Sequence, residues 1–159
     1  MTSDETSMRL KTMAFVMRHA AFVLLAFLLM GCEAEPKGDS AEVPEFLTHY
    51  FSTWSAKDME GYGGCFHEQA RITFVHQGVP QSQGLTDFLH GQKLSHATTA
   101  APMTEVPTDM KILSDERTAQ ASVRWKLTKG ADVTLGTDCF TLIKTSSGWK
   151  IMSLVFYND

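Results

Sequence analysis

Histidines are the residues of this chain with the clearest capacity for metal or proton-transfer chemistry, because imidazole binds metals and titrates near neutral pH. Five of the six follow residue 40, at positions His49, His67, His76, His90 and His96. None of them belongs to an HExxH or HxH motif or to a Cys/His pair with metal-ligand spacing. We therefore expect surface or rim histidines, no metal and no other cofactor.

Two further kinds of chemistry lack support in the sequence. The Gly61–Gly64 stretch (GYGG) is not a phosphate-binding loop, because no strand pattern precedes it and no GK[ST] follows it. No GxSxG motif is present, so nucleophilic hydrolysis has no candidate. Of the eighteen acidic and fourteen basic residues, two and three lie in residues 1–31, which leaves residues 32–159 with a net charge of −5. Without a basic cluster, we expect no nucleic-acid partner.

The cysteine at position 32 ends a segment that is typical of an export signal. Residues 20–30 are all apolar, a run far shorter than a membrane-spanning helix needs, and Arg9, Lys11 and Arg18 precede it. Leu29-Met30-Gly31-Cys32 resembles the lipobox of bacterial lipoproteins, in which the cysteine is acylated and becomes the first residue. The alternative is a buried cysteine at the end of a core helix.

This interpretation divides the chain into three parts. Residues 1–31 are the expected lipoprotein signal peptide, residues 32–41 the lipidated cysteine and a flexible tether, and residues 42–159 the folded domain. Cys32 would anchor the protein in a membrane of the bacterial envelope, facing the periplasm. In well-studied sorting systems, an Asp directly after the lipidated cysteine retains the protein in the inner membrane. This chain has Glu33 there, which favours the outer membrane. Acidic residues near Met1 leave Met8 as an alternative start.

Helical patterns come first in the predicted domain. Apolar residues at helical spacing predict a helix from Val43 to Trp54, and Asp58 can cap a short second helix. Residues 71–76 alternate like a strand, residues 78–80 (GVP) break it, and residues 81–84 return as a partner. Thr86 is the expected cap of a third helix that continues through Leu94.

Strand patterns fill the rest of the domain. Residues 104–113, 118–127, 133–144 and 149–157 predict a four-stranded meander, separated by short turn sequences. Helices ahead of an antiparallel sheet indicate the α+β class.

The order of these elements resembles the nuclear transport factor 2-like superfamily. The resemblance rests on YFSTWSAKDMEGYGGCF (50–66), ARITFV (70–75), Gly84 and GTDCFTLIKTSSGWKIMSLVF (136–156). It implies a strongly curved mixed or antiparallel sheet wrapped around a long N-terminal helix, which forms a cone with an apolar pocket. It also implies a homodimer through the outer sheet face, the arrangement of many members.

The isomerase branch of this superfamily implies a site. Tyr50 falls on its oxyanion-hole tyrosine and Asp138 on its protonated aspartate, while the position of the catalytic base holds Phe74. His76, two residues further along the same strand face, is the only nearby substitute. The other expected ligand-binding residues are aromatic: Trp54, Trp125 and Phe140. The alternative is that Tyr50 packs in the core and Asp138 makes a structural polar contact.

Three functions remain open on the sequence. We expect a lipid-anchored envelope protein that binds a small apolar molecule or a protein and has no assigned reaction. The alternative is an enzyme of the ketosteroid-isomerase or polyketide-cyclase type that acts on an apolar carbonyl compound, and the third is an assembly partner that uses the outer sheet face. Cys65 and Cys139 should remain unpaired, because alternation turns Cys139 to the outer face, away from Cys65.

Overall fold

The computed structural model describes residues 41–159, so the expected signal peptide and Cys32 lie outside the described residues. The helices in this range are α2 (Glu42–Ser55), α3 (Met59–Gly64) and α4 (Leu85–Thr98). The strands are β1 (Phe66–His76), β2 (Val79–Gly84), β3 (Met103–Ser114), β4 (Thr118–Lys129), β5 (Asp132–Thr145) and β6 (Gly148–Asn158). No helix within residues 41–159 is long and apolar enough to cross a membrane.

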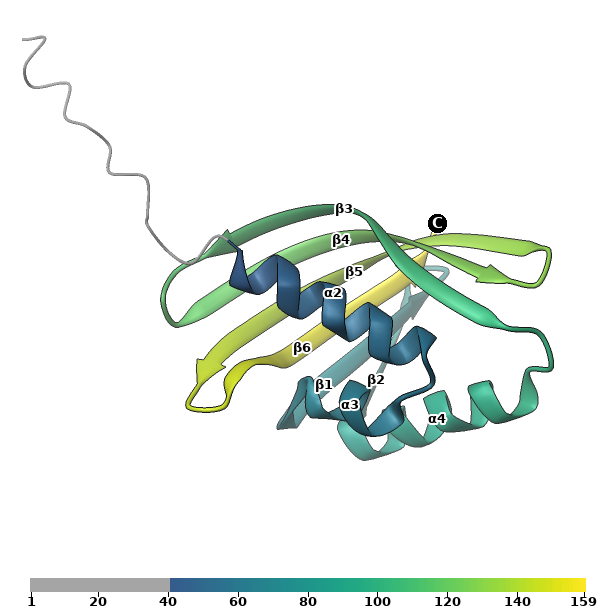
Figure 1. Ribbon diagram of the computed structural model, residues 1–159, viewed down its shortest axis with the longest axis horizontal. Helices are drawn as coiled ribbons and strands as arrows, with labels where there is room; N and C mark the ends of the chain where they lie inside the picture. The colour runs from purple at the N-terminus through teal and green to yellow at the C-terminus, as the bar shows by residue number, and fades with distance from the viewer. Residues whose placement is uncertain (1–40) are drawn as a thin grey trace, which may run out of the picture. The chain divides into compact units, whose positions relative to one another are not determined.

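The six strands form one mixed sheet in the order β2-β1-β6-β5-β4-β3. All neighbouring pairs are antiparallel except β1 and β6, which run parallel. The long strands curve, and α2 lies across one face of the sheet, which we call the inner face (Figure 1). The opposite face is the outer face. This arrangement confirms the predicted α+β class and the curved sheet around the first helix.

The inner face and α2 form the core together. Leu47 and Phe51 of α2 are fully buried, as are Ile72, Leu142 and Leu154 of the sheet. α2 carries apolar residues three and four positions apart, so burying one helical face accounts for its formation. Burial of apolar surface at this interface is the main force that holds the helix against the sheet.

Local hydrogen bonds place α3 after the first helix. The predicted cap is confirmed: the Asp58 carboxylate accepts a hydrogen bond from the Gly61 main-chain N–H at 2.9 Å. Position 61 requires glycine, since a Cβ there would lie 2.3 Å from the Asp58 carboxylate.

Two details of the first hairpin differ from the prediction. Val79 and Pro80 belong to β2, and the turn is made by Gln77 and Gly78, which both have positive φ (49° and 77°). Proline, which has no main-chain N–H, is tolerated at position 80 because β2 is one of the two edge strands of the sheet. The hairpin therefore turns earlier than GVP suggests, since two residues with positive φ match the twist of the strands.

The start of α4 also differs from the prediction. Thr86 is not the cap: Gly84 occupies the N-cap position in an extended conformation, and the helix begins at Leu85. Gly84 is still paired with Arg71 in the β1–β2 ladder, so the strand passes directly into the helix. Leu94, expected on the apolar face, is 56% exposed.

A β-bulge divides β3 into two segments. Pro107 pairs with Trp125 and Asp109 with Arg124, so one residue of β3, Thr108, has no counterpart on β4. Before the bulge, Glu105 and Pro107 are less exposed than their neighbours; after it, the less exposed positions are even-numbered. The extra residue thus brings Glu105 onto the inner face.

The two cysteines of the domain are unpaired, as predicted. Cys65 is buried where α3 ends, and Cys139 is half-buried in the middle of β5. Asp138 and Phe140, the neighbours of Cys139, are both buried, so the cysteine points to the outer face.

Candidate functional site

A cavity of about 140 Å³ lies between the inner face of the sheet and the helices. Six aromatic side chains form most of its wall: Tyr50, Trp54, Tyr62, Phe88, Trp125 and Phe156. Four polar side chains reach it, namely Gln92, Glu105, Asp138 and Asn158. Every helix described here and strands β3 to β6 contribute to this wall, so the fold as a whole shapes the cavity.

Asp138 is at the centre of a buried hydrogen-bond network. The Trp125 Nε1–H donates to Asp138 Oδ1 at 2.7 Å, and the Tyr50 hydroxyl donates to Asp138 Oδ2 at 3.5 Å. The hydroxyls of Tyr50 and Tyr62 are 2.9 Å apart, which extends the network to α3. Asp138 is 4% exposed, so these bonds replace the water that its carboxyl loses on folding.

Burial changes the protonation of this network. Loss of water raises the pKa of Asp138 to about 7, while the hydrogen bonds from Trp125 and Tyr50 act in the opposite direction. Near neutral pH, Asp138 can therefore either donate or accept a proton. Burial also raises the pKa of Tyr50 and of Tyr62 well above the usual value, so both hydroxyls stay protonated.

Glu105 is the carboxyl of the site that sequence reasoning missed. The other polar or aromatic lining residues absent from the prediction are Tyr62, Phe88, Gln92, Phe156 and Asn158. Glu105 is partly exposed, but burial of its carboxyl raises its pKa well above the usual value, and the negative charge of Asp138 raises it further. Its main chain is fixed to α2: the Glu105 N–H donates to Ser55 Oγ at 2.8 Å, and Ser55 Oγ donates to the Glu105 carbonyl at 3.0 Å. The cavity thus contains two carboxyl groups and no basic side chain among its lining residues.

Trp54 connects the cavity wall to α4 through two contacts. Its Nε1–H donates to Gln92 Oε1 at 2.8 Å, which joins α2 to α4. The His96 ring packs against the Trp54 indole with 4.5 Å between centroids. The prediction that His96 lies at the surface or rim is wrong: it is 7% exposed, because it sits one turn after Gln92 on the side of α4 that faces Trp54.

The imidazole of His96 makes no hydrogen bond within residues 41–159, because neither ring nitrogen has a partner there. Burial lowers its pKa, and the positive charge of Lys57 lowers it further, so the ring is neutral near pH 7. Among residues 41–159, no group of three or more His, Cys, Asp or Glu side chains could hold a metal ion.

The other expected site residues lie outside the cavity. Phe140 is in the core behind it, with its ring edge-on to Tyr50 at 5.2 Å. Phe74 lines a neighbouring groove of about 380 Å³ between β1, β2 and α4. His76 is exposed, and its ring stacks on Phe74 at 5.9 Å. The structure therefore brings together Tyr50, Trp54, Trp125 and Asp138, and separates the remaining three from them.

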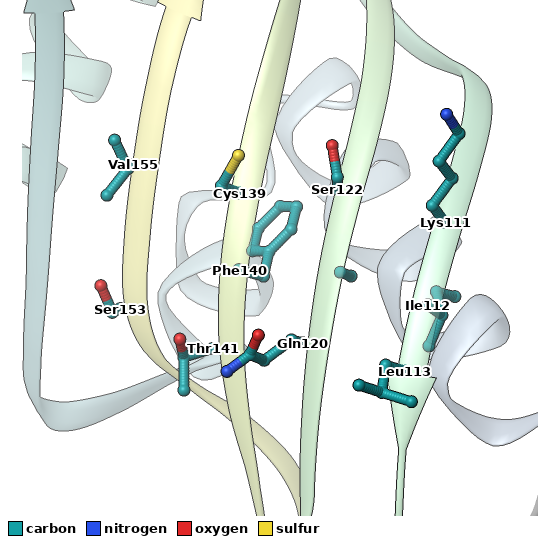
Figure 2. A pocket seen from close by; sticks show the side chains of 11 residues that line it. Lys111, Ile112, Leu113, Gln120, Ser122, Cys139, Phe140, Thr141, Ser153 and Val155 are labelled. Carbon is teal, nitrogen blue, oxygen red and sulfur yellow. The ribbon is translucent and has the colours of Figure 1, made fainter.

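A second, larger hollow lies on the outer face. It has a volume of about 490 Å³, and strands β3 to β6 form its floor (Figure 2). The side chains in Figure 2 include Lys111, Gln120, Ser122, Cys139 and Thr141. We call it the outer hollow.

Comparison with known proteins places the domain in a family. Residues 38–157 match the family model described as "Putative lumazine-binding". No curated protein matches the chain.

Solved structures share the fold at low sequence identity. An NTF2-like protein of unknown function from Pseudomonas putida is 10% identical with a TM-score of 0.66, over 76% of this chain and 87% of that one. A protein of unknown function from Mycobacterium tuberculosis is 23% identical with a TM-score of 0.65, over 82% and 78%. A "putative dehydratase" of the NTF2-like family from Streptomyces avermitilis is 19% identical with a TM-score of 0.63, over 76% and 96%.

Proposed function

Because the chain belongs to the family described as "Putative lumazine-binding" and has the nuclear transport factor 2-like fold, we propose that its domain binds a small ring-shaped molecule in the inner cavity. The observation that carries this proposal is the cavity itself, in which the carboxyl groups of buried Asp138 and partly exposed Glu105 lie between aromatic walls. Polar groups withdrawn from water without a full set of partners are costly, and a bound ligand can supply the missing partners.

The volume of the cavity limits the size of the ligand that it can hold. A volume of 140 Å³ is close to that of an apolar cavity of about 150 Å³ that accepts benzene, and below the roughly 300–1,000 Å³ of pockets for larger ligands. One or two fused rings therefore fit, whereas a four-ring steroid does not. This favours a ligand smaller than the substrate of a ketosteroid isomerase.

Lumazine is the first ligand to test, since the family description names it. It is a flat two-ring compound with ring carbonyl and N–H groups. Flat rings stack well against Trp54 and Trp125, and the Tyr50 hydroxyl and a protonated Asp138 can donate hydrogen bonds to a ring carbonyl.

Calorimetric titration of the purified protein with lumazine tests the proposal. We expect binding that weakens about fivefold or more in Tyr50→Phe and Asp138→Asn, since each variant removes one hydrogen-bonding group. Cys139→Ser, a matched change on the outer face of the same strand, should bind like the wild type. Equal binding by all three variants would contradict a site in the inner cavity.

A specific observation favours an enzyme as the second candidate. Asp138 titrates near neutral pH beside Glu105 and Tyr50, and a pair of carboxyls with raised pKa values is a common source of a general acid and a general base. One structural neighbour is described as a "putative dehydratase", and the removal of water from a compound generally uses a general acid and a general base. In this candidate, Glu105 and Asp138 move a proton on a small carbonyl compound.

This candidate predicts which residues matter. Turnover of a small cyclic ketone should fall about 10²–10³-fold in Asp138→Asn and in Glu105→Gln, and stay unchanged in His76→Ala, because His76 is outside the cavity. Loss of activity in His76→Ala alone would assign the base to His76 and remove Glu105 from the mechanism.

We also propose that the protein is anchored to the bacterial envelope through a lipid on Cys32 and faces the periplasm. The support is the sequence LLMGC behind a basic and then apolar leader. Cys32→Ser should leave the leader attached and abolish incorporation of a labelled fatty acid. Fractionation of the two membranes tests the preference for the outer membrane. Normal processing of Cys32→Ser would contradict the anchor.

A further inference from the structure

We propose that the inner cavity is selective for organic cations, and that its ligand carries an amine or another positively charged nitrogen on a small ring. This inference rests on the proposed function, because it gives the chemical class of the ligand of the same cavity. It goes beyond that function by specifying a charge.

The composition of the wall is the first argument. Two carboxyl groups, Glu105 and Asp138, reach the cavity, and no Lys, Arg or His side chain lines it. A negative ligand would find no cationic side chain in the wall to pair with. A positive ligand would supply the opposite charge that the two carboxyls lack.

The aromatic rings are the second argument. Trp54 and Trp125 contribute indole rings to the wall, Tyr50 and Tyr62 contribute phenol rings, and Phe88 belongs to the same wall. The negative face of an aromatic ring attracts a cation, and the attraction is strongest for tryptophan and in a site that excludes water. Aromatic walls with carboxyls among them form the arrangement that proteins use for ammonium groups.

Glu105 supplies the third argument. Its main chain is fixed by the two hydrogen bonds to Ser55, and its side chain reaches the cavity. No side chain within residues 41–159 donates a hydrogen bond to its carboxyl, whereas Trp125 and Tyr50 donate to Asp138. Glu105 is therefore the carboxyl that can still accept a hydrogen bond from an N–H group of a ligand.

The titratable groups around Glu105 and Asp138 determine how many protons are released or taken up when a ligand binds. Tyr50 from α2 and Tyr62 from α3 stay protonated near neutral pH, and Trp125 from β4 does not titrate. His96 of α4 lies behind Trp54 and is neutral, because burial and the Lys57 charge lower its pKa. Only Glu105 and Asp138 are thus expected to change protonation when a ligand binds near pH 7.

A cation and a neutral ligand should then respond to pH in opposite directions. A cation stabilises the ionised carboxyls, so its binding releases protons and strengthens as the pH rises. A neutral ring that accepts a hydrogen bond from a protonated carboxyl loses that donor, so its binding weakens as the pH rises. The direction of the response therefore identifies the class of ligand.

Benzylamine and benzyl alcohol are suitable probes, because they share a ring and a side arm and differ in charge. We expect the full-length protein to bind benzylamine about tenfold or more tightly than benzyl alcohol at pH 7.5, with the ratio rising from pH 6 to pH 8. Calorimetry in two buffers with different protonation enthalpies should show net release of protons with benzylamine only. Benzoate, of the same size and opposite charge, should not bind.

Two variants test the assigned groups. Glu105→Gln and Asp138→Asn keep the shape of each side chain and should each reduce the amine-to-alcohol ratio about fivefold, with Cys139→Ser as the unchanged control. The probe comparison on the wild type does not depend on the folding of either variant. If benzyl alcohol binds as tightly as benzylamine, the cation inference is wrong and the proposed binding function stands. If neither probe nor lumazine binds, both are wrong.

Discussion

Strands β3 to β6 contribute to both the inner cavity and the outer hollow, yet the two differ in volume and in the burial of carboxyl groups. On β5, Asp138 points to the cavity and the adjacent Cys139 to the outer hollow. The outer hollow is the larger, at about 490 Å³ against 140 Å³. Only the cavity holds carboxyl groups withdrawn from water. Trapped ionisable groups, and not volume, are therefore the reason why we propose the cavity and not the outer hollow as the binding site.

Crowding the cavity wall should destabilise the domain more than any other change considered below. A Cβ at position 136 would lie 2.2 Å from the Trp125 indole and 2.4 Å from the Tyr157 carbonyl oxygen, where the main chain cannot move away cheaply. Gly136→Ala should therefore lower the free energy of unfolding by about 3 kcal/mol, measured by urea denaturation.

Gly91→Ala is the control for this change. Gly91 is an exposed residue of α4 with no atom within 4 Å of an added Cβ, so alanine should stabilise the helix by about 0.5–1 kcal/mol. Equal stability of the two alanine variants would mean that the wall around Trp125 is not tightly packed.

The pH dependence of stability should differ between variants of the inner face and variants of the outer face. The pKa of Asp138 is about 7 in the folded protein and about 3.9 in an unfolded chain, so between these values the folded state retains a proton that the unfolded state releases. The contribution of Asp138 is complete below about pH 4 and is lost as the pH rises through about 7.

We expect the free energy of unfolding to fall by a few kcal/mol from about pH 4 to about pH 7 through this group, in a series of urea titrations. Asp138→Asn should reduce that slope and leave the part contributed by Glu105, whose pKa is also raised by burial, and Cys139→Ser on the opposite face should leave the whole slope intact. A slope that survives Asp138→Asn unchanged would show that Asp138 is not the group responsible.

The two cysteines should differ in their rates of alkylation, which is a smaller difference between the two sides of the sheet. Burial raises the pKa of Cys65 to about 11 and it is 3% exposed, while Cys139 is half-buried in the outer hollow. Cys139 should be alkylated by iodoacetamide at least about tenfold faster than Cys65 in the folded protein, as measured by peptide mass spectrometry. Equal rates in the native state, or a linked Cys65–Cys139 peptide, would contradict the placement of the two thiols on opposite sides.

The smallest effect on folding is expected at the rim of the outer hollow. Leu113 is 77% exposed, so Leu113→Gln should change the stability of the monomer by less than about 0.5 kcal/mol. The homodimer through the outer face remains a prediction, and analytical ultracentrifugation of this variant tests it. A dimer in the wild type that dissociates in Leu113→Gln would support it, and a monomeric wild type would contradict it.

Much of this arrangement follows from patterns in the sequence. Alternation along residues 118–127 predicts that Val123 and Trp125 face inward, and both are buried. Helical spacing places Tyr50 and Trp54 on the buried face of α2. The pairing of Tyr50 with Asp138 required the family resemblance, because no local pattern relates two residues 88 positions apart.

Glu105 and His96 could not be predicted in the same way. Val106, Met110 and Ile112 alternate as if even-numbered residues of β3 faced inward throughout, which places Glu105 outside. The bulge at Thr108 reverses the faces, and the one signal for it in the segment is Pro107, because proline within a strand is found at sheet edges and at bulges. A histidine among polar residues of a weakly amphipathic helix is typical of a surface, so contact with Trp54 decides the position of His96.

The position of the tryptophans gives the protein an optical property of its own. Trp54 and Trp125 both line the cavity, and the third tryptophan, Trp149, donates its Nε1–H to Glu42 elsewhere in the domain. Indole emission is sensitive to a neighbouring carboxyl and to the water around the ring. Two of the three tryptophans therefore report on the occupancy and charge of the cavity, and Trp149 provides a signal in the same spectrum that does not depend on the cavity.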